Sequence, residues 1–319
     1  MRKTSPLFIG IDVAKTKHDV HFHPTGEAFT VANDDDGLGA LIVILLLRSP
    51  KRVVFESTGG YARCLHRALQ AVELDSHCVP SQRVRMFAKA LGVEAKTDAI
   101  DASVIALYGA TARLVDTVKP SEAVLKLRDL AVRRRQLVDL ATRELNHRES
   151  LPPELAAGSK ELLKVIRKNV ATINKAMLSI IDGDVELAKR AAALRTIGGV
   201  GPVLCASLLA FLPELGTASN KQASSLVGVA PFNQDSSGSE KKRSIRGGRR
   251  RLRNVLYMAT RAAVRSEPAL KALYRRLKEA GKPDKVALTA AMRKLVVIAN
   301  ARVRDALRPR MEAPAAYAA

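Results

Sequence analysis

Short β-branched apolar runs and longer apolar stretches with helical spacing alternate along the N-terminal third of the chain. Runs at 7–13, 18–23 and 27–31 are separated by the turn sequences AKTK and PTGE, which predicts three strands joined as a β-meander. Two further strands are predicted at 51–57 and 76–81. The first of these is nearly continuous in apolar residues, which is typical of a central parallel strand.

Helical spacing fills most of the intervals that follow the meander. Helices are predicted at 37–49, 60–72, 84–92 and 97–115. A meander followed by parallel strands that alternate with helices is the element order of an α/β RNase H-like (RuvC-like) domain. We assign this domain to residues 1–118.

The middle of the chain is helical by pattern. Two long segments between Val118 and Arg195 are broken by the sequence LPPELAAG at 151–158. Apolar stripes on both segments predict an antiparallel helical hairpin, or a coiled coil used for dimerisation, over residues 119–190. A plain two-helix linker fits the same pattern equally well.

Residues 191–319 predict a mostly α-helical C-terminal domain. The segment 194–212 has a short helix, the turn GGVG and a second helix, which resembles a helix-hairpin-helix. Such a turn can offer backbone N–H groups to a DNA phosphate, although it can equally be a tight packing turn. Further helices are predicted at 220–230, 252–265, 268–281 and 283–307, with a loop over 231–251.

Charge is distributed unevenly over these three parts. The chain of 319 residues carries a net charge of +22, with 53 basic and 31 acidic residues. Residues 1–118 contribute +1, residues 119–190 contribute +5 and residues 191–319 contribute +16. An anionic partner is therefore expected, nucleic acid first, and the C-terminal third should supply most of the affinity for it.

Cysteine usage and hydropathy restrict the compartment. Cys64, Cys78 and Cys205 show no paired spacing, which indicates reduced, mostly buried thiols rather than a disulfide framework or a zinc site. The most apolar stretch, Leu41–Leu47, is too short to span a bilayer and is interpreted as a buried core helix. We expect a cytoplasmic, nucleoid-associated protein with no membrane contact.

Four carboxylates are the strongest candidates for chemistry. Asp12 and Glu56 end apolar strands, and Asp98 and Asp101 lie one helical turn apart. Gathered at one edge of a sheet, they would supply the oxygen ligands of two Mg²⁺ ions acting on phosphate. Each acid alone also has a structural explanation, such as a favourable position in the first turn of a helix.

A polar serine loop is the second candidate. Ser236 and Ser237 follow Asp235 and precede a run of basic residues. A serine hydroxyl can serve as a nucleophile when cations neutralise the phosphate it attacks. A flexible Ser/Gly loop beside a phosphate-binding run explains the same residues. The candidate nucleic-acid-binding residues are Lys241, Lys242, Arg243, Arg246, Arg249, Arg250, Arg251 and Arg253.

Taken in order, these motifs resemble one family. The sequences GIDVAK, FESTGGY, KTDAIDA, TIGGVGPVLCASLLAFL, LVGVAPFNQDSSG and IRGGRRRLRNVLYMA are similar to those of the DEDD transposases of the IS110 insertion-sequence family. The resemblance covers residues 7 to 300. It implies a RuvC-like domain, a coiled-coil region and a C-terminal transposase domain.

The resemblance also implies roles. Asp12, Glu56, Asp98 and Asp101 would be the metal ligands, and Ser236 would form a covalent phosphoserine–DNA intermediate. A bridge RNA encoded by the element would pair with donor and target DNA. The acid site and the serine would come from different subunits of a homo-oligomer, a dimer or a synaptic tetramer.

The residues leave open which serine is the nucleophile and two other functions. The family has a single serine before glycine, whereas this chain has two, so adjacency to Gly238 favours Ser237 while spacing from Pro231 favours Ser236. A hydrolytic RuvC-like nuclease or Holliday-junction resolvase would use metal-activated water instead of serine. A nucleic-acid-binding protein with purely structural acids is a third possibility.

Overall fold

The computed structural model describes residues 5–56, 60–93, 98–114, 120–232 and 244–308, except the side chains of residues 98–100. The chain divides into two compact units, residues 1–119 and residues 120–319. Each unit has its own hydrophobic core.

The first unit is built on one mixed sheet. Its strands are β1 (Phe8–Val13), β2 (Lys17–His23), β3 (Ala28–Ala32), β4 (Arg52–Glu56) and β5 (Ser76–Val79), in the order β3-β2-β1-β4-β5. The first three strands pair antiparallel, and β4 and β5 add in parallel to β1. The predicted meander and parallel strands are confirmed, and this arrangement is that of an RNase H-like domain.

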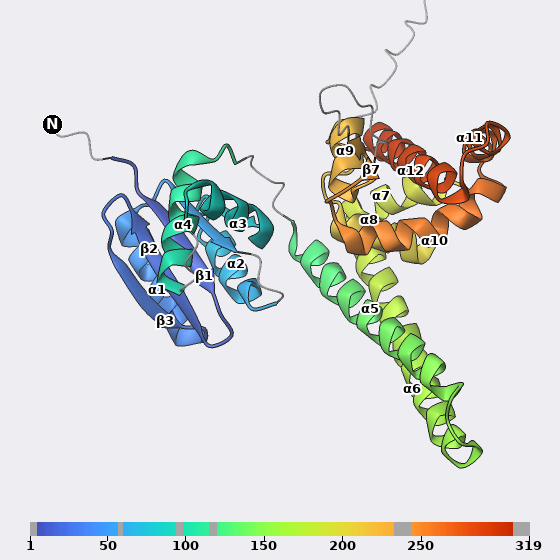
Figure 1. Cartoon of the computed structure of the whole chain (residues 1–319), viewed down its shortest axis with the longest axis horizontal. Helices are drawn as coiled ribbons and strands as arrows, with labels where there is room; N and C mark the ends of the chain where they lie inside the picture. The colour runs from blue at the N-terminus through green and yellow to red at the C-terminus, as the bar shows by residue number, and fades with distance from the viewer. Residues whose placement is uncertain (1–4, 57–59, 94–97, 115–119, 233–243, 309–319) are drawn as a thin grey trace, which may run out of the picture. The chain divides into compact units, whose positions relative to one another are not determined.

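Helices cover both faces of this sheet (Figure 1). Helices α1 (Asp35–Arg48) and α2 (Ala62–Ala71) pack on the face that carries Ile11 and Phe55. Helices α3 (Ser81–Ala90) and α4 (Asp98–Thr111) pack on the opposite face, against Val54 and Val79.

The prediction of a buried core helix at Leu41–Leu47 is correct for one side only. Leu41 and Leu45 are fully buried against the sheet, whereas Leu46 and Leu47 are 47% and 80% exposed. An outer helix of a three-layer unit meets the sheet along a single stripe, so the side chains between the stripe positions point outward.

A long helical hairpin opens the second unit. Helix α5 (Glu122–Arg148) packs along α6 (Pro153–Gly183), and the two project from the rest of the unit (Figure 1). The predicted break at 151–158 is too long, because α6 already begins at Pro153. Proline is well tolerated in the first turn of a helix, where its missing N–H would have no partner.

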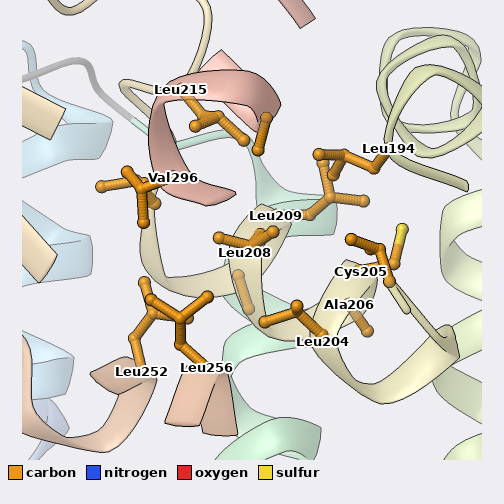
Figure 2. Packing of buried hydrophobic residues seen from close by; sticks show 14 of the residues in the cluster. Leu194, Leu204, Cys205, Ala206, Leu208, Leu209, Leu215, Leu252, Leu256 and Val296 are labelled. Carbon is orange, nitrogen blue, oxygen red and sulfur yellow. The ribbon is translucent and has the colours of Figure 1, made fainter. Parts of the chain in front are cut away.

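A helical body completes the second unit. It consists of α7 (Val185–Arg195), α8 (Pro202–Phe211), α9 (Asn220–Val227), α10 (Arg250–Ser266), α11 (Pro268–Glu279) and α12 (Asp284–Leu307). Helix α8 lies at its centre, where Leu204, Leu208 and Leu209 pack among side chains of α7, α10 and α12 (Figure 2). No helix in the described residues is long and apolar enough to cross a membrane.

The turn between α7 and α8 makes contacts within the protein. The backbone N–H of Gly198 donates to Oε2 of Glu267 at 3.0 Å, and Gly199 packs tightly on Ala263 of α10. Gly201 is exposed at the start of α8. The DNA contact suggested for this turn stays a prediction, and Gly198 is not a free donor for it.

The thiols differ from expectation. Cys205 is buried, and burial raises the pKa of its thiol to about 11. Cys64 and Cys78 are exposed, so the prediction of mostly buried cysteines is wrong for two of three. Cys64 lies on the outer side of α2, and Cys78 lies on the edge strand β5, where neither position meets a core.

Candidate active site

The ends of β1 and β4 bring two of the predicted acids together. In the parallel pairing of these strands, Ile11 stands opposite Phe55. Asp12 and Glu56 follow these residues directly and so lie on neighbouring strands, which are about 4.8 Å apart. Both are half-buried, and both alternate away from Ile11 and Phe55, onto the face that α4 covers.

Close packing of α4 on β1 sets the position of the third acid. A Cβ atom on Gly10 would overlap the carbonyl oxygen of Ala102 and the backbone nitrogen of Ala106. Only glycine permits this approach of helix and strand. Asp101 immediately precedes Ala102 and is half-buried, so it projects from the part of α4 that crosses β1.

Asp98 is the first residue of α4, and its side chain lies outside the described residues. The helix thus begins with Asp98 and carries Asp101 one turn later. Acidic residues are favoured in the first turn of a helix by the helix dipole.

A fifth carboxylate, Asp19, was not identified from the sequence. It stands directly opposite Asp12 in the antiparallel pairing of β1 and β2 and is only 9% exposed. Thr30 Oγ1 donates to its Oδ1 at 2.6 Å, and Lys17 Nζ lies 2.9 Å from its Oδ2. The period-two alternation of β2 was the available signal, since it places Asp19 on the same face as Asp12 once the pairing is known.

The donor set fits a hard divalent cation. Carboxylate oxygens are the ligands that Mg²⁺ prefers, and Asp12 and Glu56 supply them side by side. Within the described residues, no three His, Cys, Asp or Glu side chains lie close enough together to hold a metal ion, and the side chain of Asp98 is not among those described. Among the described acids, Asp12 and Glu56 are neighbours by strand register, and Asp101 lies on the helix packed beside them.

Two short strands that the sequence did not predict flank the serine loop. Strands β6 (Pro231–Phe232) and β7 (Ser244–Ile245) pair antiparallel, with Phe232 opposite Ser244. The loop predicted over 231–251 is therefore wrong at these positions. Two residues per strand are too few to produce a periodic pattern, so only pairing across the loop reveals them.

Several predicted residues belong to the segment between these strands. Ser236, Ser237, Lys241, Lys242 and Arg243 lie outside the described residues. The two residues that flank this segment, Phe232 and Ser244, are described and stand directly opposite each other. The Arg246 guanidinium lies over the Phe232 ring, 5.0 Å from its centroid, and so braces the base of the hairpin.

Two arginines hold the segment that follows the hairpin. Arg253 donates from Nη1 to the carbonyl oxygens of Gly247, at 2.6 Å, and Gly228, at 3.2 Å. Arg249 forms a bidentate pair with Glu214, with both N–O distances at 2.6 Å. Burial alone would raise the pKa of Glu214, but its hydrogen bonds and ion pair with Arg249 outweigh burial and lower that pKa.

The basic run therefore divides into two groups. Arg249 and Arg253 are half-buried and hold the fold, and Arg246 stacks on Phe232. Arg250 and Arg251 are exposed, and no hydrogen bond or ion pair engages them within the part of the chain that the structure describes. These two are the described members of the run most available to a phosphate.

Comparisons with known proteins agree with this architecture. A family model of DEDD type described as "Transposase" matches residues 9–151, and a second, "Transposase IS116/IS110/IS902 family", matches residues 191–275. Two curated relatives are "Pilin gene-inverting protein" of Moraxella lacunata and of Moraxella bovis. Each is 29% identical in an alignment of 316 positions that covers 94% of this chain and 97% of the relative.

Both family models, the full-length relatives and the RNase H-like sheet point to one class of enzyme. A protein of this class acts on DNA, and DEDD transposases typically use a divalent metal ion. The chain belongs to the IS110 family of DEDD transposases and is a DNA transposase/recombinase.

Proposed function

We propose that this transposase cleaves and rejoins DNA strands through Ser236, assisted by Mg²⁺ at the acid site. The serine oxygen attacks a backbone phosphorus and forms a Ser–O–P bond. The bond from phosphorus to the leaving deoxyribose oxygen breaks, and that oxygen takes up a proton in place of the one lost by serine. Because the phosphodiester energy is retained in the phosphoserine, a second strand can reverse the step and be joined.

The observation that carries this proposal is the braced hairpin base. A nucleophile must be presented in a defined position to gain from proximity. The β6–β7 pairing, the Arg246–Phe232 contact and the two carbonyl bonds of Arg253 all fix the chain on either side of the serine segment. A loop with only a linker role would gain little from such anchoring.

Asp12, Glu56, Asp98 and Asp101 are the residues we propose to hold two Mg²⁺ ions. When bound, such ions stabilise charge on the attacking and leaving oxygens of a phosphoryl transfer. Asp19 accepts a hydrogen bond from Thr30 and pairs with Lys17, so its charge is balanced by that cation and it needs no metal of its own.

Sequence recognition is proposed to rest on a bridge RNA that pairs with donor and target DNA. The C-terminal third has a net charge of +16, whereas aromatic residues are only 4% of the chain and tryptophan is absent. Such a surface suits phosphate contacts better than base stacking. If a paired RNA recognises the DNA bases, the protein needs to contact only the phosphate backbones of the nucleic acids.

A homo-oligomer, a dimer or a synaptic tetramer, is proposed to complete the site, with acids and serine from different subunits. The α5–α6 hairpin exposes large apolar side chains along its projecting part. These are Leu140, Leu145, Leu155, Leu162 and Val165, each at least 37% exposed. A second copy of the hairpin would cover them as a coiled coil does.

The deciding experiment compares Ser236→Ala with Ser237→Ala in cleavage of cognate DNA programmed with the RNA that co-purifies with the protein. We expect the wild type and Ser237→Ala to form a covalent protein–DNA adduct, and Ser236→Ala to form none while still binding RNA. If Ser237→Ala alone loses the adduct, the nucleophile is Ser237. If both variants cut at the normal rate, the serine mechanism is wrong and metal-activated water performs hydrolysis.

A further inference from the structure

A small pocket lies where the α5–α6 hairpin joins the helical body of the second unit. Its volume is about 180 Å³. It is lined from α5, α6, α8 and α10, and Figure 1 shows the hairpin meeting the body beside α10. The charged members of the lining are Arg134, Arg135, Asp139 and Arg251.

Arg134 presents a partly desolvated cation to this pocket. Its Nε donates to Asn174 Oδ1 of α6 at 2.7 Å, which orients the guanidinium plane. Burial lowers the pKa of Arg134, and no carboxylate bonds it within the described part of the chain. A guanidinium so placed has lost water and has not gained an anion in return.

Arg135 differs from its neighbour because it already has a counter-charge. Its Nε approaches both carboxylate oxygens of Asp139, at 2.7 and 2.8 Å. The pair contributes no net charge to the lining. The ion pair holds the Arg135 guanidinium in place through Nε. Arg135 can therefore donate a hydrogen bond to a ligand, but it adds no net electrostatic attraction for an anion.

Arg251 closes the pocket from a distant part of the sequence. It lies in the first turn of α10, is exposed, and has no ion pair among the described residues. With Arg134, Arg135, Arg251 and Asp139 counted together, the pocket carries a net charge of +2. Two arginine triplets, 133–135 and 249–251, thus each contribute to one cavity.

We propose that this pocket binds one phosphate group of a nucleic-acid backbone, held between Arg134 and Arg251. The planar guanidinium matches two phosphate oxygens at once, and a partly enclosed site strengthens that attraction relative to open water. The inference deepens the proposed function, since it assumes a nucleic-acid partner, but it does not depend on the serine nucleophile.

A phosphate bound in this pocket would hold the nucleic-acid backbone at a defined position near the β6–β7 hairpin. The first turn of α10 carries Arg251, and the same turn carries Arg253, which bonds the carbonyls next to the hairpin base. A phosphate held at Arg251 would therefore be registered against the chain that presents Ser236.

The test compares two double variants of the full-length protein that remove equal charge. The pocket pair is Arg134→Gln with Arg251→Gln. The control pair is Arg133→Gln with Arg250→Gln, which takes one exposed member from each triplet and replaces no residue of the pocket lining. Among the described residues, it removes only the hydrogen bond of 3.3 Å from Arg133 to Gln136. Affinity for a labelled DNA duplex and for a labelled RNA of equal length is measured by fluorescence anisotropy over a range of salt concentrations.

We expect the pocket pair to weaken binding about tenfold or more, as removing bonds to a charged group predicts. The control pair should lose less than about threefold, and the salt slope should fall by about 0.9 more in the pocket pair than in the control. Loss confined to the duplex assigns the phosphate to DNA, loss confined to RNA assigns it to RNA, and both are positive outcomes. Equal losses in the two pairs would overturn the proposal.

Folding is controlled separately. Thermal unfolding is measured for each pair, and if the pocket pair is not folded, Arg251→Gln is compared with Arg250→Gln, because both positions are exposed. The covalent-adduct assay keeps this inference apart from the proposed function. If the wild type forms no adduct while the pocket pair still loses more affinity than the control pair, the serine mechanism is refuted and the phosphate pocket is supported.

Discussion

The two units use charged residues in opposite ways. In residues 1–119, strand register and a close helix bring carboxylates together on one face, with Asp12 beside Glu56 and opposite Asp19. In residues 120–319, several basic residues stabilise the fold instead. Arg249 pairs with Glu214, and Arg253 donates to two backbone carbonyls. The acids at the strand ends of the first unit lie beside one another, whereas these two arginines of the second unit are each held by acceptors.

This difference shows that net charge overstates binding capacity. The C-terminal third has a net charge of +16, but an arginine that is bonded to buried acceptors cannot leave them for a phosphate without a cost. The N-terminal third has a net charge of only +1, yet its acids lie where packing cannot separate them. The acceptors and neighbours around each charged residue therefore decide its role more than the number of charged residues does.

The largest expected effect is at the acid cluster. Asp12→Asn keeps the size of the side chain and removes its charge, so we expect a loss of cleavage on the order of 10³-fold or more. The exposed Asp36→Asn on α1 is the matched control and should be active. Cleavage with and without Mg²⁺ is the measurement, and activity of Asp12→Asn that survives in EDTA would exclude the metal role.

The next effect tests how the cluster is held. Gly10→Ala places a methyl group against two backbone atoms of α4, so we expect the first unit to lose about 3 kcal/mol of stability and the acids to move apart. Gly39→Ala in α1 meets nothing within 4 Å and should instead stabilise by about 0.5–1 kcal/mol. Urea unfolding measures both, and a harmless Gly10→Ala would mean that α4 can be displaced freely.

A structural pair of the second unit gives a pH-dependent effect. The lowered pKa of Glu214 means that its contribution to stability is complete above its ordinary pKa of 4.5 and is lost as pH falls through the folded-state value. Glu214→Gln should cost about 2 kcal/mol at neutral pH. The difference from wild type should shrink below about pH 4.5. A difference that is constant with pH would show that the Arg249 pair is not responsible.

The smallest effects separate bound from available arginines. Arg250→Gln should weaken nucleic-acid binding by at most about threefold and leave thermal stability unchanged. Arg253→Gln removes donors from Gly247 and Gly228 and should lower stability by about 1–2 kcal/mol, with a binding change that follows from unfolding only. If Arg253→Gln instead lowers affinity in the fully folded protein, this arginine contacts the ligand after all.

Local pattern was sufficient for much of the first unit. The five strands, their order along the chain and the positions of Asp12 and Glu56 at strand ends all follow from apolar runs and turn residues, because both are local properties of the sequence. Helix existence in the second unit was predicted on the same grounds. Boundaries were less certain, as the early start of α6 at Pro153 shows.

Contacts between distant residues were beyond the reach of pattern. The pairing of Phe232 with Ser244, the position of Asp19 opposite Asp12, and the hydrogen bond from Gly198 to Glu267 each join residues whose sequence neighbours give no sign of the partner. The exposure of Leu47 and Cys64 could not be predicted either, because the elements that pack against a helix decide which of its sides is covered.

The sequence by itself determined the RNase H-like order of strands, the four acids and the basic C-terminal run, because periodicity and residue type are local properties. Only the tertiary structure decided which of those arginines hold the fold and which line a pocket with Arg134. The physical reason is that a guanidinium takes its role from the acceptor within its reach, and that acceptor comes from another part of the chain.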